Sequence, residues 1–263
     1  MMEHTQVSFP GSLSRVEKAS RARSNALSVA LARNMEEVRE AQRLRFQVFA
    51  EEMGAQLVSA SSGLDQDEFD SVCDHLLVRN TGSGEVVGTY RILSPEQAAR
   101  IGGYYSEQEF DLGRLTPLRS GMVEIGRSCV HPDYRGGAVI TLLWSGLADY
   151  LRRHDYNYLM GCASVDMTDG GHTAANLYHK LHAEVLSPVE WRVFPRVPLP
   201  LFRLGNDAKV STPPLIKGYL RVGAYICGEP SWDSEFNCAD FMMLLSVKQM
   251  NEQYARHFMN KAA

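Results

Sequence analysis

One stretch of the sequence, Val123–Gly137, limits the possible folds more than any other. Its first part, Val123–Val130, is rich in residues that favour a β-strand, and Pro132 with the glycine pair at 136–137 then ends that strand. From Ala138 to Leu151 the apolar residues recur at helical spacing. The chain therefore passes from a buried strand through a glycine-rich turn into a helix, an arrangement that directs backbone N–H groups at an anion.

Glu124 and Arg127 are the charged residues of this otherwise apolar strand. A carboxylate is costly to bury unless it is paired or has a chemical role. In a regular strand positions 124 and 127 face opposite sides, so an ion pair between them requires the bend or bulge that Gly126 permits. The residues leave two hypotheses open for Glu124, a general base or the partner of a structural ion pair.

Charge is unevenly distributed along the 263 residues, although the net charge is only −4. Residues 51–74 hold seven acidic residues and no Lys or Arg, whereas residues 191–221 hold six basic residues and the single acid Asp207. The basic segment could bind an anionic partner or an anionic membrane surface, or it could be an ordinary solvated face. We expect no nucleic-acid partner.

Five widely spaced cysteines without a C-x-x-C motif indicate reduced thiols in a cytoplasmic protein. The sequence contains no apolar run long enough to span a membrane, so we expect any membrane contact to be peripheral. Residues 1–25 are polar and without periodicity, which predicts a mobile lead-in followed by one domain over residues 26–263.

The pattern of apolar residues predicts an α/β (α+β) fold, with a central mixed sheet flanked by helices. Helices are expected at 35–53 with Asn34 as cap, 95–101, 138–154, 174–182 and 252–260. Strands are expected at 27–32, 75–79, 85–93, 122–130, 157–163, 216–226 and 241–247, with an edge segment at 188–200 and an acidic loop at 55–71.

Three other site chemistries fit the sequence poorly. Gly126–Val130 departs from the G-x-S-x-G nucleophile elbow at its last position. Cys129 lies on an apolar strand, where a cysteine is more often a core residue than a nucleophile. His179-x-x-His182 and Cys73-Asp74-His75 are incomplete ligand sets, so we expect no metal site.

Several blocks of sequence together carry a specific resemblance. They are Leu44–Gly54, Asp67–Val78, Gly88–Leu93, Tyr105–Leu112, Glu124–Arg135, and Pro213–Val222 with Phe236-Asn237 after it. In this order the chain resembles the ornithine lipid N-acyltransferase family, which is itself similar to acyl-homoserine lactone synthases. Arg135-Gly136-Gly137-Ala138 resembles, imperfectly, the coenzyme A turn of GNAT acetyltransferases, because Ala138 and Ile140 stand where glycines belong.

The resemblance implies a GNAT-like acyl-CoA N-acyltransferase fold with a mostly antiparallel sheet. It implies transfer of a 3-hydroxyacyl group from acyl carrier protein to the α-amino group of L-ornithine, which gives a lyso-ornithine lipid. The donor is then a phosphopantetheine-linked acyl carrier protein, with no bound cofactor. Two alternatives keep an enzymatic function: an acyltransferase for another amino acid and a lactone synthase. A third hypothesis is a non-catalytic module that binds acyl carrier protein or lipid.

The resemblance also suggests roles for particular residues. Glu124 and Arg127 would be catalytic. The bend that Gly126 permits would in addition free backbone N–H groups of Ser128, Cys129 and Val130, which would form an oxyanion hole. The phosphopantetheine arm would meet Arg135, Gly136 and Gly137. Seven residues match characteristic positions of the lactone synthases, namely Arg45, Phe49, Asp67, Asp70, Arg91, Glu124 and Arg127. The first five are the expected substrate-binding residues. The two arginines and two aspartates among these five would join the acidic loop to the helix and strand and so shape the amino-acid pocket; alternatively, an arginine binds the ornithine carboxylate and an aspartate its δ-ammonium.

The acyl chain requires an apolar tunnel. Candidates for its wall are Leu142, Leu143, Trp144, Leu147, Tyr158, Leu159 and Met160. The basic segment 191–221 could dock the acidic carrier protein or lie on anionic lipid.

Overall fold

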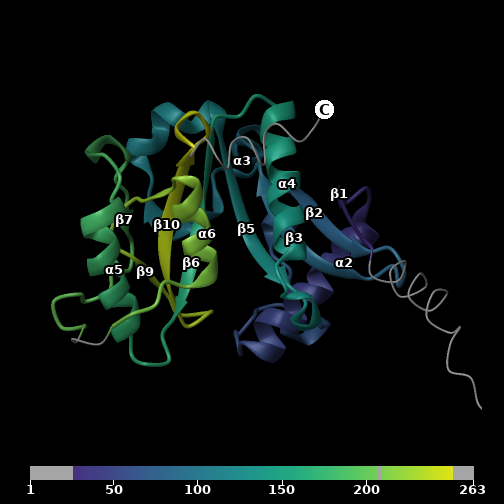
Figure 1. Cartoon of the computed structure of the whole chain (residues 1–263), viewed down its shortest axis with the longest axis horizontal. Coiled ribbons are helices and arrows are strands. Elements are labelled where there is room, and N and C mark those ends of the chain that lie inside the picture. Colours follow the sequence, from purple (N-terminus) through teal and green to yellow (C-terminus); the bar gives the residue numbers. More distant parts are fainter. Residues whose placement is uncertain (1–25, 206–208, 251–263) are drawn as a thin grey trace, which may run out of the picture.

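The computed structural model describes residues 26–205 and 209–250, and in this part of the chain an eight-stranded sheet forms the centre (Figure 1). Its strand order is β1-β2-β3-β5-β6-β10-β8, and β9 pairs with β10. The strands are Leu27–Leu31 (β1), Asp74–Asn80 (β2), Val86–Leu93 (β3), Met122–Val130 (β5), Tyr158–Asp166 (β6), Tyr225–Ile226 (β8), Ser231–Asp233 (β9) and Cys238–Ser246 (β10). Phe110–Asp111 (β4) and Phe194–Pro195 (β7) pair separately.

The sheet is mixed but mostly antiparallel, because only β5 and β6 run parallel among its paired strands. The helices are Met35–Phe46 (α2), Pro95–Ile101 (α3), Ala138–Arg153 (α4), His172–Val185 (α5) and Pro214–Val222 (α6). This architecture confirms the predicted mixed sheet with flanking helices.

Helix α2 begins where the sequence indicates. The Asn34 side chain accepts hydrogen bonds from the backbone N–H groups of Glu36 and Glu37, as an N-cap does. The helix changes to π geometry over Gln47–Glu52 and ends before Gly54, whose φ is +78°. The helical segment therefore covers nearly the whole predicted range, with a wider last part that borders the cavity described below.

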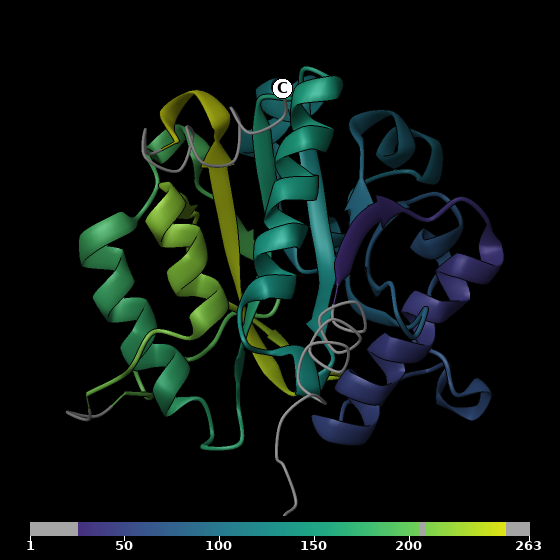
Figure 2. The same cartoon turned by 45° about the vertical axis from the view of Figure 1, so that its right-hand side comes forward.

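The two faces of the sheet bury different helices. On β10, Met243 and Leu245 pack into the cluster that contains α4, α5 and α6, whereas Met242 and Leu244 pack on the other side. Figure 2 shows α4, α5 and α6 side by side along one face, with α2 away from them. Strands β3 and β10 are buried along their whole length, as central strands covered on both faces should be.

Strands β5 and β6 pair only at their beginnings. Their register joins Met122–Glu124 to Tyr158–Met160 and stops there. At Gly161 a Cβ atom would collide with the Ile125 carbonyl oxygen, so only glycine fits this close approach. The edge of β5 that faces β6 has no strand partner past Glu124 in the described chain, and a cavity lies there.

One predicted strand is wrong. Residues 216–226 were expected to be extended, but α6 occupies Pro214–Val222 and only Tyr225–Ile226 forms a strand. Ile216, Tyr219 and Val222 are the buried residues of α6, and their spacing of three is helical; Pro214 starts the helix and Gly223 ends it at φ +99°.

Smaller differences concern the irregular segments. The edge segment expected at 188–200 is a strand only at Phe194–Pro195. The acidic loop contains two short 3₁₀ segments, Ala60–Ser62 and Glu68–Ser71. The lead-in at 1–25 and the helix at 252–260 lie outside the described residues.

Candidate active site

A cavity of about 340 Å³ lies between the diverging halves of β5 and β6. Strand β5 lines it from Glu124 to Val130, and β6 contributes Cys162 and Ser164. The π-helical turn, the acidic loop, β3 and α6 supply apolar walls; these include Val48, Phe49, Met53, Phe69, Leu93, Leu215 and Tyr219. The cavity therefore combines an apolar wall with the exposed edge of a strand that carries charged side chains.

Glu124 lines this cavity and is only 4% exposed. Its carboxylate accepts hydrogen bonds from the backbone N–H groups of Tyr105, at 2.7 Å, and Ser106, at 2.9 Å, and from the Ser106 hydroxyl. Burial raises the pKa of Glu124, and these hydrogen bonds oppose the rise. The carboxylate thus holds the segment before β4 in place while it faces the cavity.

Arg127 adopts an unusual backbone conformation, with φ +49°. The register shifts here, because Arg91 pairs with Gly126 and Thr89 with Cys129, which leaves Arg127 and Ser128 opposite one residue of β3. This is a β-bulge, so the bend predicted at Gly126 occurs one residue later. Bulging turns the Arg127 side chain toward the cavity side of β5.

The Arg127 side chain is paired with aspartates of the acidic loop instead of Glu124. Its guanidinium lies 3.3 Å from both Asp65 and Asp67, and between the rings of Tyr105 and Phe236 at 5.0 and 4.8 Å from their centroids. The ion pair considered for Glu124 and Arg127 is therefore absent between these two described residues.

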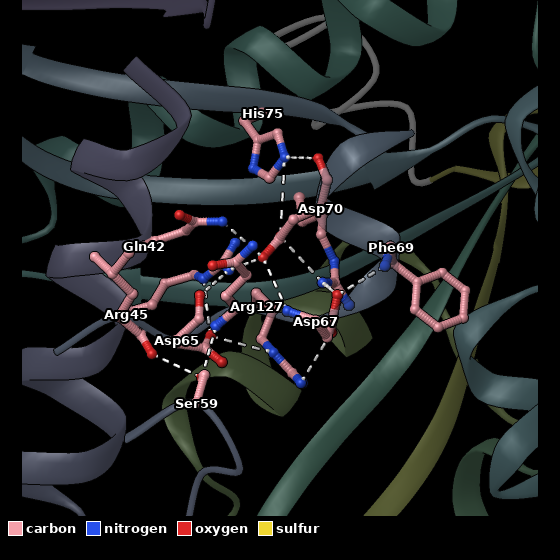
Figure 3. A network of polar contacts seen from close by, with 12 residues as sticks. Gln42, Arg45, Ser59, Asp65, Asp67, Phe69, Asp70, His75 and Arg127 are labelled. Carbon is pink, nitrogen blue, oxygen red and sulfur yellow. Dashed lines mark hydrogen bonds and ion pairs between the residues drawn. The ribbon is translucent and has the colours of Figure 1, made fainter. Parts of the chain in front are cut away.

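A buried network joins the acidic loop to α2 and β3 (Figure 3). Arg45, fully buried, contacts Asp65 at 2.8 Å and Asp70 at 2.7 Å; Arg91 contacts Asp67 at 2.5 Å and Asp70 at 3.2 Å. Burial alone would raise the pKa of the Asp70 carboxyl, but the two guanidinium groups hold it well below its usual range.

The five residues expected to bind substrate separate into two groups. Phe49 and Arg91 line the cavity, whereas Arg45, Asp67 and Asp70 lie behind its wall. The second group contacts the acidic loop and its neighbours, as the joining arrangement requires.

Cys129 is buried, and desolvation raises the pKa of its thiol to about 12. It is therefore protonated at neutral pH and unsuited to act as a nucleophile. Its backbone pairs with Thr89, and that of Val130 pairs with Gly88, while Ser128 lies in the bulge. The expected oxyanion-hole residues thus border the cavity, and among them Ser128 lies outside the paired register.

The turn Arg135-Gly136-Gly137 precedes α4 at one end of the cavity. Arg135 lines the cavity and forms a two-point ion pair with Glu52, at 2.5 and 2.6 Å. Gly137 is the N-cap at φ +97°, and no side chain caps the first N–H groups of the helix. This helix start can accept an anionic group.

The residues expected to form an acyl tunnel lie outside the cavity lining, so this prediction was wrong. Leu143, Leu147 and Leu159 belong to the core between the sheet and α4–α6, and Met160 to the core on the other face. Leu142 and Trp144 pack against the first of these cores and Tyr158 against the second. Helix α4 uses its apolar stripe to cover the sheet, which leaves none of it for a tunnel.

Sequence analysis missed several acidic and polar residues near the cavity. Ser106, Asp233 and Asp240 line it, and Glu109 lies beside Asp240. Asp240 carried a usable signal, because it is an acid in the apolar strand Cys238–Ser246, as Glu124 is in β5. Of the described residues, none forms a helix long and apolar enough to cross a membrane.

Comparison with known proteins agrees with this architecture. Residues 44–145 match the family model for an acetyltransferase (GNAT) domain. A protein of Rhodobacter capsulatus named L-ornithine N(alpha)-acyltransferase is 39% identical over 248 residues, covering 88% of this chain and 93% of its own. A protein of Brucella abortus with the same name is 36% identical, covering 90% of each chain.

Solved structures with similar folds are more distant in sequence. The CoA-dependent acyl-homoserine lactone synthase BjaI is 13% identical with a TM-score of 0.52, and the match covers 90% of this chain and 92% of that one. FeeM, an N-acyl amino acid synthase from uncultured soil microbes, is 12% identical with a TM-score of 0.52, over 87% and 98% of the two chains. These likenesses show a shared GNAT-like fold.

Proposed function

Because the chain belongs to the L-ornithine N(alpha)-acyltransferase family, we propose that this acyltransferase moves a 3-hydroxyacyl group from acyl carrier protein to the α-amino group of L-ornithine. The product is a lyso-ornithine lipid. The observation that carries the proposal is the cavity between β5 and β6, which is lined by Glu124, three arginines and an unpaired strand edge.

In this proposal Glu124 is the general base. Aminolysis of a thioester needs a neutral amine, and an α-amino group is largely protonated at neutral pH. Burial raises the pKa of Glu124, which makes it a better proton acceptor than an ordinary glutamate. Glu124 takes the amine proton directly or through water as the amine attacks the thioester carbonyl, and backbone N–H groups near the bulge at Arg127–Ser128 stabilise the oxyanion. The C–S bond then breaks, and the phosphopantetheine sulfur leaves as a thiol with the proton that Glu124 took.

In this proposal the donor binds beside the turn that precedes α4. A phosphopantetheine arm has one phosphate, which the turn Arg135–Gly137 and the uncapped start of α4 bind. The acyl chain lies against the apolar wall that contains Phe49 and Leu215. Exposed basic residues of segment 191–221 dock the acidic carrier protein on the cytoplasmic side of the membrane; they are Arg196, Arg203, Lys209, Lys217 and Arg221.

Mass spectrometry of lipids tests the substrates. The chain is expressed in a bacterial host that has no amino-acid lipids, and new 3-hydroxyacyl-ornithine is the expected result. The purified protein is then given 3-hydroxyacyl groups on acyl carrier protein or on coenzyme A. Absence of acyl-ornithine from both experiments, with folded protein present, contradicts the proposed reaction.

The base is tested by Glu124→Gln across a range of pH. The variant should lose about 10²-fold or more in rate at pH 7, as loss of a general base does, and recover as pH rises and the free amine becomes neutral. Glu107→Gln is the matched control, because Glu107 pairs with Arg119 and holds the same segment without contacting Glu124. A pH-independent loss shared by both variants would assign Glu124 a purely structural role.

A further inference from the structure

A second group of acids lies at the cavity, away from the arginine network. Asp240 of β10 lines the cavity at 4% exposure, opposite Ser164 of β6 in the register. Side-chain atoms of Glu109, Cys162 and Asp240 lie within 4.8 Å of one another, and those of Asp233, Cys238 and Asp240 do so as well. The carboxyl groups of Glu109 and Asp233 therefore both lie close to that of Asp240.

Glu109, Asp233 and Asp240 form no ion pair with an arginine, lysine or histidine among the described residues. The ion pairs of this part of the chain are made by other aspartates and glutamates. The Glu109 carboxylate receives a thiol contact from Cys162 at 3.8 Å, and Asp240 receives one from Cys238 at 3.7 Å. The Glu109 Oε1 atom is shielded from solvent and has no hydrogen-bond partner in the described chain. Asp240 is also hydrogen-bonded to the side chains of Ser164 and Glu109, so the acids are held by neutral donors and by one another. An ammonium group would supply the cationic partner that this buried cluster lacks.

The protonation of the cluster fits a site that is empty of cation. Burial raises the pKa of Glu109, and the nearby Asp240 charge raises it further. Burial likewise raises the pKa of Asp240, to which Asp233 adds repulsion. An ammonium group placed among these carboxyls would reverse that effect and replace the protons they hold.

The rest of the cavity supplies the complementary charge. Arg91 and Arg127 line it together with Glu124, while the acid cluster borders β6, β9 and β10. A molecule with a carboxylate and an amine at one end and a second ammonium at the other can meet both groups of side chains. An amino acid whose side chain is uncharged would leave the acids unpartnered.

We propose that Asp240 and Asp233 bind the side-chain ammonium of the acceptor amino acid, with Glu109 supporting Asp240, and that this arrangement selects for diamino acids. The inference rests on the proposed function, since it concerns the acceptor of that reaction. Asp240 contacts the ammonium from the cavity wall, and Glu109 supports Asp240 from behind. These residues position and select the substrate and take no part in the proton transfer assigned to Glu124.

The test compares L-ornithine with L-norvaline, which has the same carbon chain without the side-chain amine. Acyl transfer to each is measured by mass spectrometry with the wild-type protein, Asp240→Asn and Glu109→Gln. Wild type should prefer ornithine in kcat/KM by about 10²-fold or more, since a site built for a polar group rejects an analogue that lacks it. Asp240→Asn should reduce kcat/KM for ornithine by about 10- to 100-fold, chiefly through KM, and leave norvaline unchanged.

Glu184→Gln is the control for removal of a negative charge, because Glu184 is exposed on α5 and far from the lining. It should retain the wild-type preference. Equal use of ornithine and norvaline by wild type overturns the inference without any variant, and so does an equal loss for both substrates in folded Asp240→Asn or Glu109→Gln. If wild type acylates neither amino acid, the proposed function itself fails.

Discussion

Asp70→Asn should destabilise the fold strongly, because Asp70 lies at the centre of the buried network. Its carboxylate accepts from Gln42 at 3.1 Å, Arg45 at 2.7 Å, Arg91 at 3.2 Å and the Asp67 backbone at 3.2 Å. Removing one partner of a buried ion pair costs about 3–5 kcal/mol. Each arginine keeps a second aspartate, so we expect the lower end, about 3 kcal/mol, at neutral pH.

The measurement is urea unfolding followed by circular dichroism, with thermal melting as a second probe. A loss of about 3 kcal/mol corresponds to a melting temperature lower by about 6–12 °C in a chain of this size. Asp149→Asn is a matched control: Asp149 also contacts two arginines, Arg152 at 2.6 Å and Arg153 at 2.7 Å, but its side chain is 28% exposed. Its loss should be within about 1 kcal/mol.

The same variant should alter the pH dependence of stability. The pKa of Asp70 is lower in the folded state than in the unfolded chain, so its contribution is complete above the unfolded pKa of about 4 and falls as pH drops below it. The gap between wild type and Asp70→Asn should be constant from pH 7 to 5 and narrow on further acidification. A loss below about 1 kcal/mol at neutral pH, or a gap that widens in acid, would refute this reasoning.

Two further changes test the packing and the chemistry of β5. Gly161→Ala should lower the free energy of unfolding by about 1–3 kcal/mol in the same urea titration, since the new Cβ would collide with the Ile125 carbonyl oxygen. Gly218→Ala in α6 is the control: its Cβ would meet no atom within 4 Å, so this change should be neutral or stabilising. Cys129→Ala should keep acyl transfer within a few-fold of wild type in initial-rate assays, because the thiol is protonated and the role proposed for this residue belongs to its backbone N–H; complete inactivation of folded protein would restore the nucleophile hypothesis.

The sequence correctly predicted the helices and strands that are determined by their own residues. Residues 122–130 form the expected strand because β-branched residues are concentrated there, and Asn34 caps α2 through its own side chain. The segment 216–226 was misassigned because a short apolar run does not distinguish strand from helix, and the buried spacing becomes evident only in contact with β10.

The geometry of the site depended on tertiary contacts. No local preference places an arginine at φ +49°; Arg127 is held there by Asp65, Asp67 and two aromatic rings that come from distant segments. Asp240 was missed because the predicted strand began one residue after it, so its alignment with Ser164 was not considered. Glu124 and Asp240 are both acidic residues in otherwise apolar strands, which is visible in the sequence. Only the pairing of β5 with β6 and of β6 with β10 brings the two side chains to one cavity.

The two charged groups at the cavity differ in how far they are already neutralised. Arg91 and Arg127 each contact aspartates of the acidic loop, so much of their charge is compensated before any substrate arrives. Glu109, Asp233 and Asp240 have no such compensation in the described chain. The cavity should therefore favour an acceptor with excess positive charge, and this preference should weaken only slightly with salt, because buried charges are screened far less than exposed ones.

Docking of the carrier protein on the exposed basic segment should instead be strongly salt-dependent, so KM for the donor should rise with ionic strength while the ornithine preference persists.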